Sequence, residues 1–245
     1  MKQFGLIGLP LVHSFSKKYF TEKFENEGIA AQYDLYELPK ISAFTALLEN
    51  TNLSGLNVTI PYKEKVMDYL DFLDDTASQI GAVNVIKFIR TEGGLKLKGY
   101  NSDAIGFEES IKPLLHSHHT RALILGTGGA SKAINYTLRK LGIETTFVSR
   151  TAKPGMLTYD ILNAQILNDY PVIINASPVG TFPHADECPD IPYQYLTDKH
   201  LLFDVVYNPT ETLFLQKGKA RGAQVMNGEG MLLGQAKAAW KIWNE

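Results

Sequence analysis

The sequence predicts an α/β protein of two domains, and three features of the chain lead to this fold class. Short apolar runs alternate with segments of helical periodicity through the first hundred residues, a pattern typical of βαβ units and a mostly parallel sheet. After a predicted hairpin, the same alternation begins again near residue 102. The glycine-rich stretch LILGTGGAS then joins an apolar run to a helical one, as in Rossmann-like domains.

In the first half, residues 83–90 and 94–100, separated by Thr91, Glu92 and Gly93, are expected to pair as a hairpin. Residues 61–70 should form a helix with Pro61 in its first turn, where proline costs no hydrogen bond. Before it, Val58 and Ile60 should anchor a strand. The remaining elements are a strand at 2–8, a helix at 16–27 closed by Gly28, a strand at 31–38, a helix at 41–48 and the strand at 53–60.

In the second half, the glycine-rich stretch should open a helix over 128–142 that ends at Gly142. Segment 181–194, rich in proline and acidic residues, is expected to be a long loop, and the polar run HSHHT at 116–120 an exposed connection. The other elements are a helix at 103–115, strands at 122–126, 145–150, 171–176, 201–207 and 223–227, and an amphipathic closing helix at 229–243.

Composition restricts the class of protein. The chain has 245 residues, 44% of them hydrophobic and 20% charged, with a formal net charge of −2. This balance is typical of an ordinary soluble protein and gives no electrostatic reason to expect nucleic acid or anionic lipid as a partner. There is no long apolar run, and the N-terminus lacks a signal-peptide pattern, so no membrane association and a cytoplasmic location are expected. The single cysteine, Cys188, fits a reducing compartment.

The glycine turn predicts a dinucleotide site. Gly126, Gly128 and Gly129 permit a tight turn, so that backbone N–H groups at the helix N-terminus can approach a pyrophosphate. Ser131 stands where the usual motif has its third glycine, so the fingerprint is approximate. A glycine turn that binds no ligand is the alternative.

The end of the next strand indicates which dinucleotide would bind. An NAD-binding unit places Asp or Glu there to accept hydrogen bonds from the ribose. This chain has Ser149, Arg150 and Thr151, with Lys153 just beyond. A guanidinium, hydroxyls and an ammonium suit a 2′-phosphate, so NADP is favoured over NAD. Alternatively, Arg150 and Lys153 are solvated loop charges.

Polar side chains gather at the ends of predicted elements in the first half, where α/β proteins bind ligands. Taken singly, they have ordinary explanations: Ser16 and Asp103 as helix N-caps, Asn84 as a turn residue and Thr59 as a strand former. Together, the hydroxyls and amides suit a small polyhydroxylated ligand that bears a carboxylate. The group comprises Ser14 and Ser16 in HSFS, Asn57, Thr59 and Lys63 in NVTIPYK, Asn84 in GAVN, and Asn101 and Asp103 in GYNSD.

Taken in order, these segments closely resemble the shikimate dehydrogenase family. The resemblance covers nearly the whole chain and rests on HSFS, NVTIPYK, GAVN, GYNSD, GTGGAS, SRT, NASPVGT, DVVYNP and NGEGMLLGQ. It implies NADPH-dependent reduction of 3-dehydroshikimate to shikimate in aromatic amino-acid biosynthesis. It also implies a substrate-binding catalytic domain over 1–101, with the helix 228–245 packing back on it, and an NADP-binding Rossmann-like domain over 102–227.

The resemblance also implies roles for individual residues. Lys63, paired with Asp103, would be the acid/base residue, because its ammonium can donate the proton that ketone reduction needs. Ser14 and Ser16 would bind the substrate carboxylate, with Tyr207 assisting. The residues holding the ring hydroxyls would be Thr59, Asn84, Asp103 and Gln235. The residues lining the cofactor would be Gly126, Thr127, Gly128, Gly129, Ala130, Ser149, Arg150, Thr151, Lys153, Val205 and Gly228. Asn57 is expected to support Lys63 or the neighbouring loop.

The chain departs from the family pattern at three places. Lys17 stands where the family usually has proline, which alters the entry into the helix but not the serines. Ser149 replaces the usual asparagine, so NADP recognition would rest more on Arg150 and Thr151. The interval 150–171 is short, which suggests that a helix and a strand are trimmed.

Other functions remain open on the sequence alone. They are a quinate/shikimate dehydrogenase using NAD, a non-catalytic regulatory module that binds a nucleotide or metabolite, and a methylenetetrahydrofolate dehydrogenase. Arg150 argues against the first, Lys63 and Asp103 against the second, and the serine pair against the third. His116, His118 and His119 have no carboxylate or cysteine at ligand spacing, so no metal is expected, and His13 should make a structural hydrogen bond. The protein could be a monomer or a homodimer.

Overall fold

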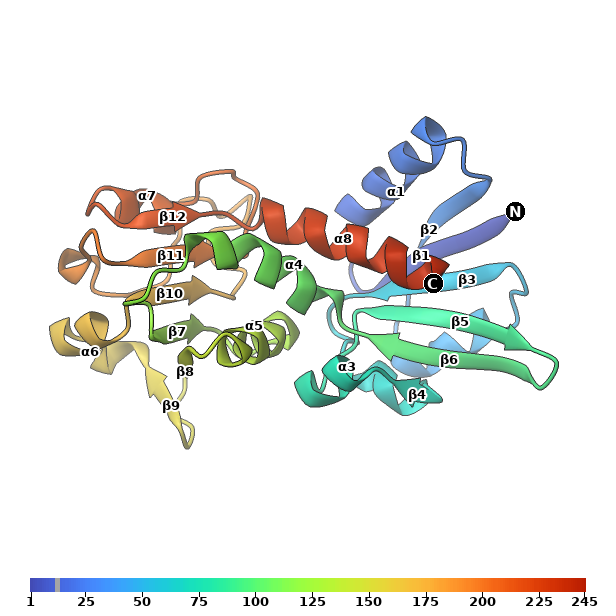
Figure 1. The fold of residues 1–245 in the computed structure, drawn as a ribbon, viewed down its shortest axis with the longest axis horizontal. Helices are drawn as coiled ribbons and strands as arrows, with labels where there is room; N and C mark the ends of the chain where they lie inside the picture. Colours follow the sequence, from blue (N-terminus) through green and yellow to red (C-terminus); the bar gives the residue numbers. More distant parts are fainter. Residues whose placement is uncertain (12–13) are drawn as a thin grey trace. The chain divides into compact units, whose positions relative to one another are not determined.

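The computed structural model describes residues 1–11 and 14–245, and it divides into two compact units. Unit 1 comprises Met1–Ser102 and Gln235–Glu245, and unit 2 comprises Asp103–Gly234. A six-stranded sheet forms the centre of each unit (Figure 1). The predicted α/β class with two mostly parallel sheets is confirmed. The hydrogen bond expected of His13 lies outside the described residues.

Unit 1 is built on a sheet in the order β2-β1-β3-β5-β6-β4. Strand β1 is parallel to β2 and β3, whereas β5 is antiparallel to β3 and β6. The predicted hairpin is confirmed, with Thr91 opposite Gly94 at its turn. The strand expected at 53–60 ends at Val58, so Ile60 is 71% exposed instead of facing the core. The strands are β1 Lys2–Gly8, β2 Ala31–Glu37, β3 Leu53–Val58, β4 Phe72–Leu73, β5 Val85–Thr91 and β6 Gly94–Tyr100.

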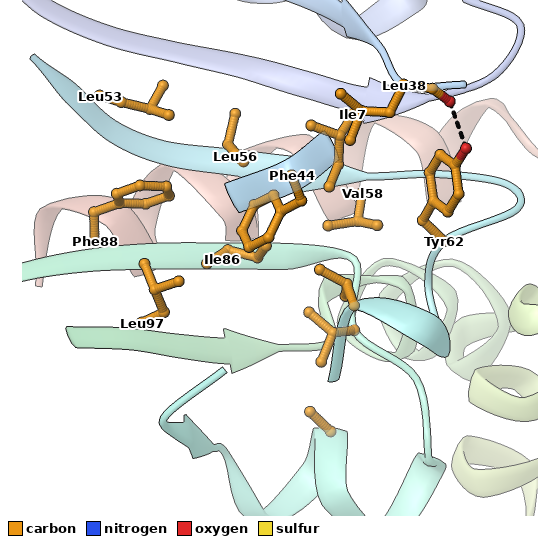
Figure 2. Close-up of a cluster of buried hydrophobic side chains, with 13 residues drawn as sticks. Ile7, Leu38, Phe44, Leu53, Leu56, Val58, Tyr62, Ile86, Phe88 and Leu97 are labelled. Carbon is orange, nitrogen blue, oxygen red and sulfur yellow. Dashed lines mark hydrogen bonds between the residues drawn. The ribbon is translucent and has the colours of Figure 1, made fainter. Parts of the chain in front are cut away.

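The helix expected at 61–70 is wrong, because only a 3-10 helix, η2 (Lys65–Tyr69), forms there. The carbonyl of Lys63 accepts a hydrogen bond from the Val83 amide at 2.7 Å, on another segment, instead of from an amide further along a helix. The buried Tyr62 side chain donates to the Leu38 carbonyl (Figure 2). These contacts hold residues 61–64 as a turn, so Lys63 does not lie in the first turn of a helix.

The other helices of unit 1 follow the sequence pattern more closely. Helix α1 (Phe15–Asn26) begins one residue before the expected start and ends before Gly28. The segment expected to be helical at 41–48 is a 3-10 turn, η1 (Ile41–Ala43), that leads into α2 (Phe44–Leu47). Helix α3 (Asp75–Ile80), capped by the Asp74 side chain, and the two-residue β4 were not predicted.

Two apolar clusters pack against the unit 1 sheet. Leu6 and Ile7 are neighbours in β1 but belong to different clusters, so the clusters lie on opposite faces. The Ile7 cluster contains residues of β3 and β5 and the short elements around them (Figure 2). The Leu6 cluster includes Phe20 of α1 and Trp243 of α8 (Glu229–Asn244). The Trp243 indole donates to the Ile86 carbonyl at 3.1 Å, which fixes the end of α8 in unit 1.

Unit 2 contains a parallel sheet in the order β12-β11-β10-β7-β8-β9 (Figure 1). From β7 the chain adds strands first on one side and then on the other, which is the doubly wound order of Rossmann domains. Every residue of β10 and β11 is buried, as expected for a parallel sheet covered on both faces. The strands are β7 Arg121–Leu125, β8 Glu144–Ser149, β9 Met156–Thr158, β10 Val172–Asn175, β11 Leu201–Asp204 and β12 Gln224–Met226.

The helices expected in unit 2 are present, and the structure contains others that were not expected. The predicted loop at 181–194 is confirmed up to the short η5 (Tyr193–Tyr195). The short interval 150–171 holds β9, η4 (Tyr159–Ile161) and α6 (Ala164–Asp169), and neither α6 nor α7 (Leu213–Lys219) was predicted; the trimming relative to the family stays a prediction. In the described ranges, no helix is long and apolar enough to cross a membrane. The helices are α4 Ser102–Ile111, η3 Lys112–Leu114, α5 Gly129–Lys140, η4 Tyr159–Ile161, α6 Ala164–Asp169, α7 Leu213–Lys219 and the first part of α8.

The HSHHT run is only partly an exposed connection, because His119 is 5% exposed. Both nitrogens of the His119 ring contact the backbone. Nδ1 accepts from the His116 amide at 3.0 Å, and Nε2 lies 3.3 Å from the Lys199 carbonyl oxygen. Burial lowers the pKa of His119 below its ordinary value. Among residues 1–11 and 14–245, no group of three or more His, Cys, Asp or Glu is arranged to hold a metal ion.

Candidate functional site

The glycine turn of unit 2 lies at the point where the strand order reverses. Gly126 follows β7 with a φ of 115°, a left-handed conformation that favours glycine. A Cβ added to Gly126 would lie 3.1 Å from the Ala176 carbonyl oxygen, so the loops after β7 and β10 cross closely here. In open α/β sheets, ligands bind at this switch point.

The first turn of α5 has the features of a phosphate-binding helix N-terminus. Its N-cap, Gly128, makes no side-chain cap, and a Cβ added to Gly128 would meet no atom within 4 Å. The space in front of the helix N–H groups is therefore open on the Gly128 side. Ser131, in place of the usual third glycine, is buried and donates to the Gly128 carbonyl at 2.6 Å. Uncapped N–H groups behind an open turn fit the pyrophosphate of a dinucleotide.

The end of β8 presents hydroxyl and cationic groups. The Thr151 amide donates to Ser149 Oγ at 3.3 Å, so Ser149 shapes the turn while Arg150, Thr151 and Lys153 are exposed. Burial raises the pKa of Tyr159, and the positive charge of Arg150 opposes that shift. The donor set fits a 2′-phosphate, which accepts hydrogen bonds and carries negative charge.

The loops after β10 and β11 are joined by a buried carboxylate that sequence reasoning missed. Asp204 accepts hydrogen bonds from Asn175 Nδ2 at 2.9 Å, from the Val206 amide at 3.0 Å and from Thr212 Oγ1 at 2.6 Å. Burial raises its pKa to about 6, and these donors partly oppose the shift. In the sequence, the acidic residue inside the apolar run LLFDVVY was the feature that could have indicated this buried carboxylate.

Two predicted cofactor residues, Val205 and Gly228, are brought together beside this carboxylate. The Gly228 amide donates to the Val206 carbonyl at 3.2 Å, and a Cβ on Gly228 would collide with the Val205 carbonyl. Glycine is therefore required at 228 for this close approach. Tyr207, predicted to assist with the substrate carboxylate, is 39% exposed, and partial burial raises its pKa.

In unit 1, the serine pair lies where β1 leads into α1. Ser14, and not Ser16, is the N-cap of α1: Ser14 Oγ accepts from the Lys17 amide at 3.2 Å. This bond uses a lone pair of the hydroxyl, so the Ser14 proton is available to another acceptor. Ser16 lies inside the first turn and is partly buried, so the alternative that Ser16 is an N-cap is wrong.

Thr59 and Lys63 are held in a loop between two strand ends. The Thr59 amide donates to the Ile7 carbonyl at 2.9 Å and the Tyr62 amide to the Thr59 carbonyl at 2.9 Å. The Lys63 carbonyl is held by Val83, next to Asn84. Both Thr59 and Lys63 are partly exposed, so their side chains are accessible from a backbone that several hydrogen bonds fix.

Asn84 has a structural task of its own. Its Oδ1 accepts from the Ser102 amide at 2.6 Å, and its Nδ2 donates to Ser102 Oγ at 3.0 Å. The Asn84 side chain therefore satisfies the N-terminus of α4. Asp103 is buried in the first turn of that helix rather than at its N-cap, in a position favourable for a negative charge.

The strand register explains why these polar groups meet at one edge of the unit 1 sheet. Ile7 is paired with Val58, Asn57 with Val85, and Val85 with Tyr100. The ends of β1, β3 and β6 and the start of β5 consequently lie side by side. Ser14, Ser16, Thr59, Lys63 and Asn84 leave from this edge, whereas Gln235 comes from α8.

The predicted residues divide between the two units. Unit 1 holds Lys63, Gln235 and the substrate residues of the sheet edge, whereas Asp103 and Tyr207 belong to unit 2. All the predicted cofactor residues lie in unit 2. The pairing of Lys63 with Asp103 stays a prediction.

Comparisons with known proteins match the chain along its full length. A sequence model of the shikimate dehydrogenase substrate binding domain matches residues 6–86. The chain is 34% identical over 260 residues to a shikimate dehydrogenase (NADP(+)) of Caldanaerobacter subterraneus subsp. tengcongensis, covering 99% of this chain and 91% of the relative. The crystal structure of shikimate dehydrogenase from Aquifex aeolicus matches with a TM-score of 0.86 at 33% identity, covering 100% of this chain and 92% of that one. Shikimate 5-dehydrogenase from Thermus thermophilus, solved in complex with NADP(H) and shikimate, matches with a TM-score of 0.85 at 30% identity, covering 99% and 93%.

Proposed function

This chain belongs to the shikimate dehydrogenase family, and we propose that it catalyses the reversible NADPH-dependent reduction of 3-dehydroshikimate to shikimate, in aromatic amino-acid biosynthesis. It is an oxidoreductase, and its cofactor is NADP. The observation that carries the proposal is the match of the whole chain to NADP(+)-dependent relatives, with one of them solved with both ligands. The glycine turn and the polar sheet edge support it with donor groups suited to a dinucleotide and to a carboxylate-bearing polyol.

The proposed chemistry needs a hydride donor and a proton donor. When bound, NADPH supplies the hydride to the ketone carbon. The carbonyl π electrons move to oxygen, and the Lys63 ammonium donates a proton to the alkoxide that develops there. The Asp103 carboxylate orients this ammonium. In the reverse direction, neutral Lys63 accepts the hydroxyl proton as hydride leaves the same carbon.

The remaining side chains of the proposed site bind and orient the ligands. Ser14 and Ser16 donate to the substrate carboxylate, and Tyr207 adds a third hydroxyl. Thr59, Asn84, Asp103 and Gln235 hold the ring hydroxyls. The residues that would hold the cofactor are Gly126, Thr127, Gly128, Gly129, Ala130, Ser149, Arg150, Thr151, Lys153, Val205 and Gly228. Residues 1–101 with 228–245 thus act as the substrate domain, and 102–227 as the NADP domain.

We also propose that the protein works in the cytoplasm as a monomer or homodimer, without a nucleic-acid or membrane partner. The net charge of −2 supports this, because it provides no attraction to polyanions. Size-exclusion chromatography with light scattering decides between the two oligomeric states.

One steady-state assay tests the reaction. Shikimate and quinate are each offered with NADP and with NAD, and cofactor reduction is followed by absorbance. We expect shikimate with NADP to give the highest kcat/KM, because Arg150, Thr151 and Lys153 favour a 2′-phosphate. Faster turnover with NAD and quinate would indicate the alternative quinate/shikimate branch. Ligand binding with no turnover of any pair would indicate a regulatory module instead.

A further inference from the structure

A chain of buried hydrogen bonds runs through unit 1 behind the polar sheet edge. Tyr33 Oη, from β2, donates to Asn57 Oδ1, from β3, at 2.8 Å. Asn57 Nδ2 donates to the Asn84 carbonyl at 3.3 Å. Tyr33 is 3% exposed, Asn57 4% and Asn84 3%, so these bonds are made away from water. Three segments far apart in sequence are connected by this relay.

The packing of Tyr33 does not explain its hydroxyl. Its ring stacks on Phe20 at 4.8 Å between centroids and lies 6.4 Å from the Trp243 ring, so a phenylalanine would fill the same apolar space. A buried hydroxyl is retained at no cost only if it is hydrogen-bonded. Apolar packing therefore does not explain why residue 33 carries a hydroxyl that is hydrogen-bonded to Asn57.

The Tyr33 end of the relay is a neutral donor. Burial raises the pKa of Tyr33, so it remains a neutral phenol that can donate to Asn57.

The other end of the relay reaches the loop before β5. The Asn84 carbonyl accepts from Asn57 Nδ2 and from the Val58 amide, the latter at 2.9 Å. The backbone of Asn84 is therefore fixed from β3, while its side chain engages Ser102. Without the Asn57 bond, the Asn84 carbonyl would be held by the Val58 amide alone, so a small shift of this backbone, and with it of the amide side chain, would cost less.

We propose that Tyr33 and Asn57 are positioning residues for shikimate, which set the location of Asn84. The inference rests on the proposed function, in which Asn84 holds a ring hydroxyl.

Two variants test the two hydrogen bonds of the relay separately. Tyr33→Phe removes the bond to Asn57 but leaves the bond from Asn57 to Asn84. Asn57→Asp is nearly isosteric and can still accept from Tyr33, but it places an oxygen against the Asn84 carbonyl. Tyr170→Phe is the matched control, because Tyr170 is a buried tyrosine of unit 2 whose hydroxyl accepts from Arg121 at 2.9 Å and lies 2.9 Å from Thr146 Oγ1.

The readout is KM for shikimate against KM for NADP, together with Tm and calorimetric titration of shikimate. We expect Tyr33→Phe to raise KM and Kd for shikimate roughly five- to tenfold and Asn57→Asp to raise them further. KM for NADP and kcat should change less than about threefold, because neither residue contacts the reacting carbonyl or the cofactor. Tyr170→Phe should lower Tm with shikimate KM unchanged.

A shikimate KM and Kd in Tyr33→Phe within twofold of the parent, at a Tm loss equal to that of Tyr170→Phe, would overturn the inference. If Asn57→Asp does not fold, Tyr33→Phe decides alone. A parent protein that binds shikimate without turnover contradicts the proposed function but leaves the relay to be judged by the binding data. A parent protein that does not bind shikimate contradicts both.

Discussion

At the scale of single residues, the polar groups of the unit 1 edge combine structural and chemical tasks. Ser14 caps α1 through a lone pair, and Asn84 satisfies the start of α4 with its amide. The bond to Ser14 uses only a lone pair of its hydroxyl, so the Ser14 proton remains for a ligand. The anchored side chain is thereby preorganised, and less conformational entropy is lost when the ligand binds.

Replacing the proposed proton donor should affect the chemical step. We expect Lys63→Ala and Asp103→Ala to lower kcat by about 10²- to 10³-fold while KM for NADP stays nearly constant, since general acid catalysis contributes on this order. Lys65→Ala is the matched control, because Lys65 is an exposed lysine in η2 two residues further on. Stopped-flow or steady-state NADPH absorbance measures the effect. Activity of Lys63→Ala within tenfold of the parent would contradict the assigned role.

Asp204 makes the stability of the protein depend on pH. Its carboxyl has a pKa of about 6 when folded against an ordinary value of 3.8, so the folded protein binds more protons between these values. The contribution to stability is therefore fully present below pH 3.8 and is lost as pH rises through about 6. From pH 5 to 8, the parent should lose roughly 1.4 kcal/mol relative to Asp204→Asn, which cannot ionise.

Urea unfolding of the parent and Asp204→Asn at the two pH values measures this difference. Other titrating groups, including His119, are common to both proteins and cancel in the comparison. A stability difference that does not change with pH would show that Asp204 is ionised at both values or protonated at both.

The sequence located the polar groups at the strand ends but not every buried side chain that holds them. Thr59, Lys63 and Asn84 could be found because strand ends in α/β proteins carry ligand-binding residues. Tyr33 could not, because a tyrosine in the strand AQYDLYE has the same pattern whether its hydroxyl is buried or solvated. The partner of Asn57 depends on strand order, which local sequence does not specify.

At the scale of elements, tertiary contacts account for the differences from the sequence pattern. The segment PYKEKVMDYL has helical spacing, yet the capture of the Lys63 carbonyl by Val83 and of the Tyr62 hydroxyl by Leu38 prevents a helix. Helix α7 was missed because its seven residues, LFLQKGK, contain a glycine. Gly218 is needed there, since a Cβ would collide with Leu202 of β11. The long alternating segments, whose burial follows their periodicity, were predicted correctly.

Helices α4 and α8 approach so closely that one methyl group should separate them. A Cβ on Gly234 would lie 2.8 Å from Gly106 Cα and 3.2 Å from Glu109 Oε2. Alanine favours a helix over glycine by up to about 1 kcal/mol, so Gly234→Ala would raise the free energy of unfolding if the added methyl group met no neighbour. We expect Gly234→Ala to lower the free energy of unfolding by roughly 1–3 kcal/mol, because backbone must move.

Gly93→Ala in the β5–β6 turn is the matched control, since its Cβ would meet only Thr91 Oγ1, at 3.6 Å. It should change the free energy of unfolding by less than about 0.5 kcal/mol. Urea unfolding followed by circular dichroism measures both variants. A Gly234→Ala protein as stable as the parent would show that α4 and α8 can separate without loss.

At the scale of the whole molecule, the two units share helices. Helix α4 begins at Ser102 of unit 1 and continues in unit 2, whereas α8 begins in unit 2 and ends in unit 1. Met231 lies in a core cluster of unit 2, and Ala236 and Trp243 lie in a cluster of unit 1. Since α8 is continuous, loss of structure in one unit removes a packed turn at the border of the other.

The shared helices predict that a ligand of unit 2 stabilises unit 1. Both tryptophans of the chain, Trp240 and Trp243, lie in unit 1, so their fluorescence reports on that unit alone. NADP at about 100 times its dissociation constant stabilises the protein that binds it by about 2.7 kcal/mol. If unfolding is coupled through α4 and α8, the thermal midpoint of tryptophan fluorescence should rise by roughly 5–10 °C, together with that of circular dichroism. A fluorescence midpoint that NADP leaves unchanged, beside a second and higher circular dichroism transition, would mean that the units unfold separately and that α8 breaks between Met231 and Ala236.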